Sequence, residues 1–174
     1  MAGYCLRPIA NRLAEVGLRL NPAKTRIVYC KDGTRRLDHE HTWFTFLGFT
    51  FRARKARGRN NRNFTSFLPA ISKDALNKLS GAVRRWRLHH WTGLSLVELA
   101  SWVNPIVRGW MQYYGAFYRS ELYPLLRRIN AYLVRWLREK FKRLRPFNKA
   151  KACWQRITRQ DPSAFAQWAW VVWF

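Results

Sequence analysis

Apolar residues recur every three or four positions between Ser120 and Arg143, and this spacing constrains the fold more than any other feature. It predicts one long amphipathic helix, because residues three and four apart share a helix face. The apolar positions are Leu122, Leu125, Leu126, Ile129, Leu133, Trp136, Leu137 and Phe141. The remaining face carries Arg127, Arg128, Arg135, Arg138, Lys142 and Arg143. Such a wide apolar face has to pack against other helices, so the sequence predicts a helical bundle.

Two more helices are predicted before residue 91. The first covers 5–16 and is stopped by Gly17. The second starts after Ser72, which is a good N-cap residue, and continues to about His90. Its expected core positions are Leu76, Leu79, Val83 and Trp86.

Capping signals place further helices in the second half of the chain. Ser95 with Glu98 three residues later is a capping box. Asn104 followed by Pro105 predicts a new helix, or a sharp kink, because proline is favoured at the first helical position and breaks a helix interior. Two shorter helices are expected near 148–158 and 161–170.

The first third of the chain has β-type patterns. Residues 25–30 are β-branched and predict a strand, and the Asp-Gly pair in 31–36 predicts a hairpin-type loop. Residues 42–54 predict a second strand, in which Gly48 marks a bulge or a close backbone approach. A short strand is also expected over 64–69.

These elements predict an α+β fold that is mainly α. A basic loop over 55–63 separates the strand-rich part from the helical part. The predicted domains are therefore 1–62, a small helix with a β-hairpin, and 63–174, a helical bundle.

The chain has 174 residues and a formal charge of +24, and the charge is spread over both parts. Residues 1–62 carry 14 basic and 4 acidic side chains, and 63–174 carry 19 and 5. A folded body with this excess needs an anionic partner, and a polyphosphate chain is the best candidate. Three widely spaced cysteines do not favour a disulfide framework, and no apolar run is long enough for a membrane span.

The stretch "NPIVRGWMQYYGAF", residues 104–117, has two different faces at helical spacing. One face is aromatic and is predicted to be core: Ile106, Trp110, Tyr113, Tyr114 and Phe117. The other carries Arg108, Gln112, Gly115 and Arg119 and is predicted to contact phosphate. The alternative to a core position for Trp110 is that its ring stacks on RNA bases.

Four motifs in this order resemble the C-terminal part of bacterial group II intron reverse transcriptases, or maturases. They are "RLAEVGLRLNPAKTRIVYC", "FTFLGFTFRAR", "FLPAISKDAL" and the long segment from "NPIVRGWMQYYGAF" to "FKRL". The resemblance extends to about Trp168. It implies that residues up to about 55 are the end of the polymerase palm and that residues from about 70 are the thumb, or maturase X domain.

The resemblance implies a role for several sets of residues. Phe46, Leu47, Gly48 and Phe49 are similar to the primer grip, which holds the nucleic-acid 3′ end. Asn104, Pro105, Gly109, Trp110, Tyr113 and Tyr114 fall on the maturase-specific motif. Lys24 and Thr25 fall on the family's "NPxKT" turn. The residues expected to bind RNA are Arg84, Arg85, Arg108, Gln112, Arg119, Arg127, Arg128, Arg135, Arg138, Lys142 and Arg143.

The implied function is RNA binding that assists intron folding and splicing, with clamping of a template–primer duplex. The implied partners are structured intron RNA, the template–primer duplex and an N-terminal reverse transcriptase fragment, with no membrane, in the bacterial cytoplasm. No cofactor is expected, and Mg²⁺ would enter only through the bound RNA or a complementing polymerase chain.

The family's catalytic Tyr-x-Asp-Asp turn would lie N-terminal to residue 1. The nine acidic residues here are scattered, whereas two-metal phosphoryl transfer needs convergent carboxylates. DNA synthesis by this chain alone is therefore not expected, nor is target-DNA cleavage, which the family assigns to a later endonuclease segment. Two alternatives stay open: the C-terminal subunit of a split RNA-directed DNA polymerase, and a degenerate intron remnant.

The sequence gives weaker support for other candidate sites. His39 and His41 flank Glu40 after Asp38, but a solvated hairpin tip explains this pattern better than a metal site. His89 and His90 are expected to end a helix and not to be catalytic. Cys153 is expected to be a small buried residue.

Overall fold

The computed structural model describes residues 2–31, 39–58 and 60–174, which form two compact units. Unit 1 comprises Met1–Phe44 and Phe51–Leu68, and unit 2 comprises Thr45–Thr50 and Pro69–Phe174. The fold is 56% helical, and the described residues contain five α-helices and a three-stranded antiparallel sheet. The predicted mainly α, α+β class is therefore confirmed, whereas the predicted domain boundary near residue 62 stays a prediction.

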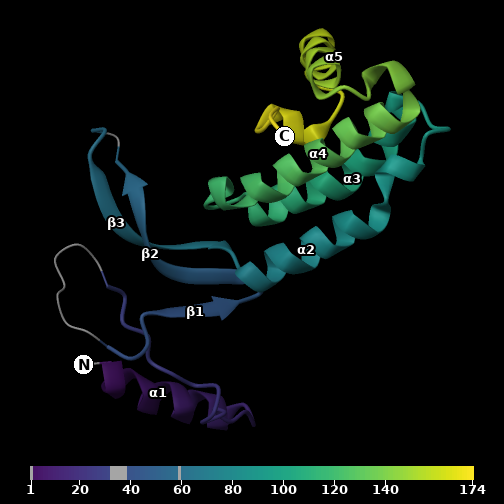
Figure 1. The fold of residues 1–174 in the computed structure, drawn as a ribbon. Coiled ribbons are helices and arrows are strands. Elements are labelled where there is room, and N and C mark those ends of the chain that lie inside the picture. The colour runs from purple at the N-terminus through teal and green to yellow at the C-terminus, as the bar shows by residue number, and fades with distance from the viewer. Residues whose placement is uncertain (1, 32–38, 59) are drawn as a thin grey trace. The chain divides into compact units, whose positions relative to one another are not determined.

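The elements follow one another along the chain as Figure 1 shows. The helices are α1 Ala2–Glu15, α2 Lys73–Trp86, α3 Leu96–Tyr114, α4 Tyr123–Lys140 and α5 Phe147–Gln160. The strands are β1 Trp43–Phe46, β2 Phe49–Arg57 and β3 Asn63–Ile71, in the sheet order β1-β2-β3. Short 3₁₀ helices are η1 Leu88–His90, η2 Arg119–Leu122, η3 Lys142–Leu144 and η4 Ala166–Ala169.

Unit 1 holds few buried side chains. Its helix α1 ends before Gly17, whose φ of 75° lies in the region that glycine adopts freely, as predicted. Asn21 begins the following turn, since its carbonyl accepts from the Thr25 amide at 2.8 Å and the Thr25 hydroxyl at 2.7 Å. Phe44 stacks on Phe51 with ring centroids 4.6 Å apart.

The predicted strand over 25–30 is wrong, because this segment is irregular. Tyr29 donates its amide to the carbonyl of His41 at 2.8 Å, but the segment is not part of the sheet. A β-branched run becomes a strand only where a ladder of partners accepts it. The predicted hairpin loop over 31–36 falls largely outside the described residues, and Asp38 lies outside them as well.

The predicted single strand over 42–54 is also wrong. It is a hairpin, because β1 and β2 are joined by the two-residue turn Leu47–Gly48 with φ values of 48° and 79°. Two central residues with positive φ are the geometry that matches the twist of paired strands. The loop predicted over 55–63 is shorter than expected, since β2 continues to Arg57 and β3 begins at Asn63.

Two helix starts in unit 2 are confirmed by their caps. The Ser72 hydroxyl accepts from the Ala75 amide at 3.1 Å. The Ser95 hydroxyl accepts from the Glu98 amide at 3.2 Å, and the Glu98 carboxylate accepts from the Ser95 amide at 2.7 Å. α2 ends earlier than predicted, at Trp86, because Arg87 takes a left-handed conformation with a φ of 48°.

The new helix predicted to begin at Asn104 is wrong, since α3 is continuous from Leu96 to Tyr114 with Pro105 inside it, whereas the alternative of a sharp kink stays a prediction. Asn104 is not an N-cap. Its side chain donates to the carbonyl of Ala164 and accepts from the amide of Ala166, both at 2.8 Å. Tertiary packing of the helix compensates for the hydrogen bond that proline removes. The helix predicted over 161–170 is likewise only the 3₁₀ turn η4.

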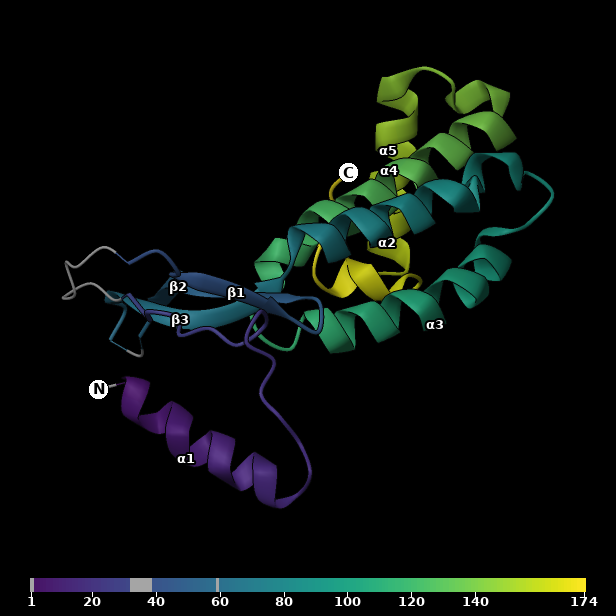
Figure 2. The same cartoon turned by 90° about the horizontal axis from the view of Figure 1, so that it is seen from below.

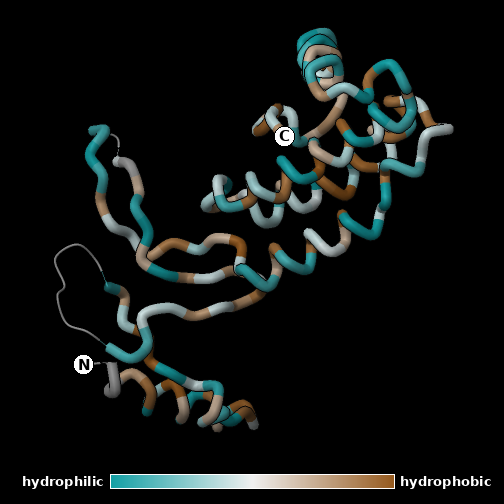
Figure 3. Tube along the Cα trace, viewed as in Figure 1, coloured by the Kyte–Doolittle hydropathy of each residue, from teal (hydrophilic) through white to brown (hydrophobic). Residues whose placement is uncertain are grey.

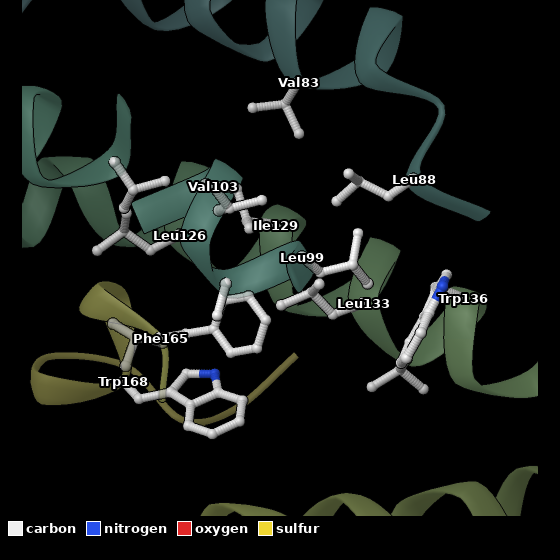
Figure 4. Packing of buried hydrophobic residues seen from close by; sticks show 14 of the residues in the cluster. Val83, Leu88, Leu99, Val103, Leu126, Ile129, Leu133, Trp136, Phe165 and Trp168 are labelled. Carbon is white, nitrogen blue, oxygen red and sulfur yellow. The ribbon is translucent and has the colours of Figure 1, made fainter. Parts of the chain in front are cut away.

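The core of unit 2 is built around α4, which contacts α2, η1 and α5 (Figures 1 and 2). Figure 3 shows teal and brown alternating along these helices, as expected for helices with one polar and one apolar face. The predicted apolar face of α4 is buried, although Phe141 just beyond it remains 38% exposed. We call residues 162–174 the C-terminal segment. Figure 4 shows Phe165 and Trp168 of this segment packed against the core.

Buried polar groups fix the C-terminal segment to α4. The Asn130 side chain donates to the carbonyls of Val171 and Trp173, both at 2.9 Å. It accepts from Gln167 Nε2 at 3.1 Å and from Trp168 Nε1 at 3.2 Å. Asn130 is fully buried, so these bonds satisfy an amide that would otherwise destabilise the core.

Candidate nucleic-acid interface

The exposed face of α4 carries a stripe of arginines, which we call the α4 arginine stripe: Arg127, Arg128, Arg135 and Arg138. At 100° per residue these four positions lie within about 100° of arc, opposite the buried leucines. Within the described part of the chain, Arg127, Arg128 and Arg135 form no ion pair with a carboxylate. These three arginines are therefore free to meet an external anion.

Arg138 differs from the other members of the stripe. It is half-buried, and its Nε donates to the carbonyl of Arg145 at 2.8 Å. Part of its role is thus to fix the chain after η3. Arg135, Arg138 and Arg145 line a groove of about 620 Å³, which also contains Glu139.

The remaining predicted RNA-binding residues flank this helix. Arg84 and Arg85 are exposed on the last turn of α2, and Lys142 and Arg143 are exposed on η3. Arg143 also lines a groove of about 480 Å³ together with Lys149 and Arg156 of α5. Arg145, Lys149 and Arg156 were not among the predicted residues, although the basic run from Lys140 to Arg156 was a usable signal.

The polar face predicted on 104–117 is exposed at Arg108 and Gln112. Arg119 is exposed as well, and its guanidinium lies 5.1 Å from the centroid of the Trp170 ring. Gly115 has no room for a side chain, because a Cβ atom there would overlap the Trp170 ring and the Met111 carbonyl oxygen. Trp170 was not predicted, since only the fold brings it to this helix.

The aromatic face predicted as core is only partly buried. The buried residues of this part of α3 are instead Val103, Asn104, Val107 and Met111. Trp110 is half-buried and stacks on Trp86, with ring centroids 5.4 Å apart and an interplanar angle of 7°. Tyr113 and Phe117 are 48% and 62% exposed.

Within unit 2, Tyr113 and Tyr114 contact the Leu47–Gly48 turn. Tyr113 donates its hydroxyl to the Leu47 carbonyl at 2.9 Å. Gly48 lies so close to Tyr114 that an added Cβ atom would be 3.1 Å from the Tyr114 hydroxyl, so the close approach predicted for Gly48 is confirmed. Burial, followed by the neighbouring Tyr113, raises the pKa of Tyr114.

This packing presents part of the predicted primer grip outward. Phe49 is buried and its ring lies 5.2 Å from Tyr113 and 5.5 Å from Tyr114. Phe46 and Leu47 are 60% and 67% exposed. On one side of the turn Phe49 is therefore packed against the tyrosines, and on the other side the apolar side chains of Phe46 and Leu47 are exposed.

The described residues include four histidines, at positions 39, 41, 89 and 90. His89 and His90 form η1 with Leu88, and burial, followed by the charge of Arg135, lowers the pKa of His89 from 6.5. No group of three His, Cys, Asp or Glu side chains that could hold a metal ion occurs in the described ranges. Cys153 is free and half-buried. Among the described helices, none is both long and apolar enough to cross a membrane.

The fold and this surface define a basic helical domain with a β-hairpin turn packed on one of its helices. Residues 76–156 match the family model of the group II intron, maturase-specific domain. This part of the chain is therefore a group II intron maturase domain, the resemblance is confirmed there, and the function is maturase-related. A search of curated proteins found no match, and a search of solved structures found none either.

Proposed function

We propose that unit 2 binds structured RNA of a group II intron and assists its folding for splicing. The observation that carries this proposal is the α4 arginine stripe inside the maturase-specific domain. Arg127 and Arg138 are separated by about 16 Å along the helix at 1.5 Å per residue, so the stripe can contact several phosphates. The planar guanidinium group suits phosphate because it can donate two parallel hydrogen bonds.

Salt dependence of RNA binding tests this proposal. If six to ten phosphates are contacted, the affinity of the whole chain for a structured intron RNA should fall by roughly 10³–10⁵ between 50 and 200 mM salt. The measurement is fluorescence anisotropy with a labelled RNA over this salt range. A flat response would contradict the electrostatic picture.

Single substitutions test the surface itself. Arg127→Ala and Arg128→Ala should each lower the log–log salt slope by about one unit, because each removes one phosphate contact. Arg12→Ala in unit 1 is the matched control, since Arg12 already pairs with Glu15. Equal slopes for the stripe variants and the parent would place the RNA elsewhere.

We further propose that the exposed side of the Leu47–Gly48 turn contacts the end of a template–primer duplex. Its support is the free position of Phe46 and Leu47 beside an anchored Phe49. Phe46→Ala should weaken binding of a primed duplex with a recessed 3′ end more than binding of a blunt duplex. Phe64→Ala, at an exposed phenylalanine of unit 1, is the control.

A second candidate, the C-terminal subunit of a split RNA-directed DNA polymerase, is favoured by the exposed apolar side chains of unit 1. Ile9, Val16, Leu18 and Ile27 are 47–60% exposed. A separate chain that carries the fingers and the Tyr-x-Asp-Asp turn would cover them. Primer extension after mixing this chain with such a fragment is the expected result, and no co-elution of the two would contradict this candidate.

A further inference from the structure

The C-terminal segment and α3 together line an open pocket in unit 2. Its apolar lining consists of Met111, Pro162, Phe165, Ala166, Ala169 and Trp170. Its polar lining consists of Arg108, Gln112 and Ser163. The pocket volume of about 380 Å³ falls within the roughly 300–1,000 Å³ of small-molecule sites.

The wall of this pocket is held in place by a buried amide. Asn104 is only 8% exposed and makes one hydrogen bond to the Ala164 carbonyl and one from the Ala166 amide. Phe165, between these two residues, is 1% exposed. The backbone around the pocket is therefore fixed by the core and does not depend on a ligand.

The charges around the pocket favour an anion beside an apolar group. Arg108 lies at its edge, and Arg119 is held against Trp170. Asp161 is the acidic residue next to this segment, and its Oδ1 already accepts from the amide of Ser163 at 3.1 Å and from its hydroxyl at 2.8 Å. A flat apolar ligand that carries a phosphate matches this combination of an aromatic wall and cations.

We propose, resting on the RNA-binding function above, that this pocket takes the base of one unpaired RNA nucleotide. The base lies against Trp170, and its phosphate lies at Arg108 and Arg119. Gln112 and Ser163 supply polar groups for the edge of the base. Proteins recognise unpaired bases by such stacking and edge contacts, whereas a paired base in a duplex cannot enter a pocket.

Two RNA hairpins of equal charge test the proposal in the whole chain. One carries a single bulged uridine, and the other carries an abasic site at the same position, so both have the same number of phosphates. The parent should bind the uridine hairpin about tenfold more tightly, since stacking of one base on an aromatic side chain has this size of effect. The readout is the ratio of the two dissociation constants.

Ala169→Phe fills the pocket from the last residue of η4, which is exposed. It should bring the ratio close to one and leave the affinity for the abasic hairpin unchanged. Gln112→Glu provides a second test should the first variant not fold, because Gln112 is exposed on α3. The carboxylate should lower the ratio because, unlike the amide, it cannot donate a hydrogen bond to a carbonyl oxygen of the uracil edge.

Gln155→Glu is the matched control, because it makes the same change of charge at an exposed position of α5. It should leave the ratio unchanged. A direct measurement is photocrosslinking with 5-iodouridine in the bulge, for which we expect the adduct on Trp170. Adducts on the Trp86–Trp110 stack instead would overturn the assignment.

The failures of the two proposals are distinguishable. Equal affinity of the parent for both hairpins, or a ratio that Ala169→Phe and Gln112→Glu do not change, would overturn the pocket and leave RNA binding intact. Binding of neither hairpin at low salt would overturn the proposed function itself.

Discussion

The two units differ in how much of their apolar side chains is buried. In unit 2 the apolar faces of α2, α3 and α4 meet in one core. In unit 1, Arg54 is the only buried residue among the side chains that the structure describes, and Trp43, Val16 and Leu18 are each more than half exposed. Apolar composition alone therefore does not make a core, because a core also needs a second face to pack against.

The largest expected loss of stability is that of Trp136→Ala in unit 2, which we compare with Trp43→Ala in unit 1. Trp136 is 1% exposed and its indole donates to the Trp91 carbonyl at 2.9 Å, whereas Trp43 is 58% exposed. Trp136→Ala should lower the free energy of unfolding by about 3–5 kcal/mol. Trp43→Ala should change it by about 0.5 kcal/mol. Urea denaturation measures both, and equal losses would break the contrast between the units.

A smaller loss is expected at the buried amide of α3. Asn104→Ala leaves the Ala164 carbonyl and the Ala166 amide without their partner and should cost about 2–3 kcal/mol. Asn77→Ala, at an exposed position of α2, is the control and should be close to neutral. Thermal unfolding gives the comparison. If both variants melt alike, the C-terminal segment is not part of the core of unit 2.

Two glycines of unit 2 sharpen the contrast between packed and open positions. Gly115→Ala should cost about 1–3 kcal/mol, because the new Cβ atom would push against Trp170. Gly109→Ala should instead stabilise by about 0.5–1 kcal/mol, since a Cβ there meets nothing within 4 Å and alanine favours a helix. Opposite shifts in the urea midpoint are expected, and shifts of the same sign would contradict the packing.

The smallest effect is the pH dependence of the capping box. Hydrogen bonds from the Ser95 amide, and next from its hydroxyl, lower the pKa of Glu98 below its ordinary value of 4.5. A lowered pKa stabilises the fold above 4.5, and this contribution is lost as the pH falls through the lower, folded-state value. The difference in midpoint between the parent and Glu98→Gln should therefore shrink below pH 4.5. A constant difference would show that the carboxylate charge does not contribute.

The features that the sequence predicted correctly depend on near neighbours along the chain. The Ser72 cap, the Ser95–Glu98 box and the apolar face of α4 follow from residues three or four apart. The predicted stripe positions Arg127, Arg128 and Arg135 are exposed, although RNA contact itself stays a prediction.

The features that the sequence missed depend on distant partners. Asn104 looked like a cap because its partner carbonyl and amide lie 60 and 62 residues away. The turn at Leu47 was missed because leucine rarely adopts a φ of 48°, and the hydroxyl of Tyr113 that bonds it comes from α3. Trp170 and the pocket were missed for the same reason.

The hydrogen bonds of Asn104 can form only after residues 164 and 166 have been synthesised. Sixty residues separate this amide from the Ala164 carbonyl, which corresponds to about 3–12 s of translation at about 5–20 residues per second. During that interval α3 has been made, but the segment that lines the pocket with it has not. A ribosome that stalls before residue 164 therefore leaves a chain that contains the arginines of α4 but lacks the residues that line the pocket with α3. Under the two proposals above, such a chain could contact phosphates but not recognise a base.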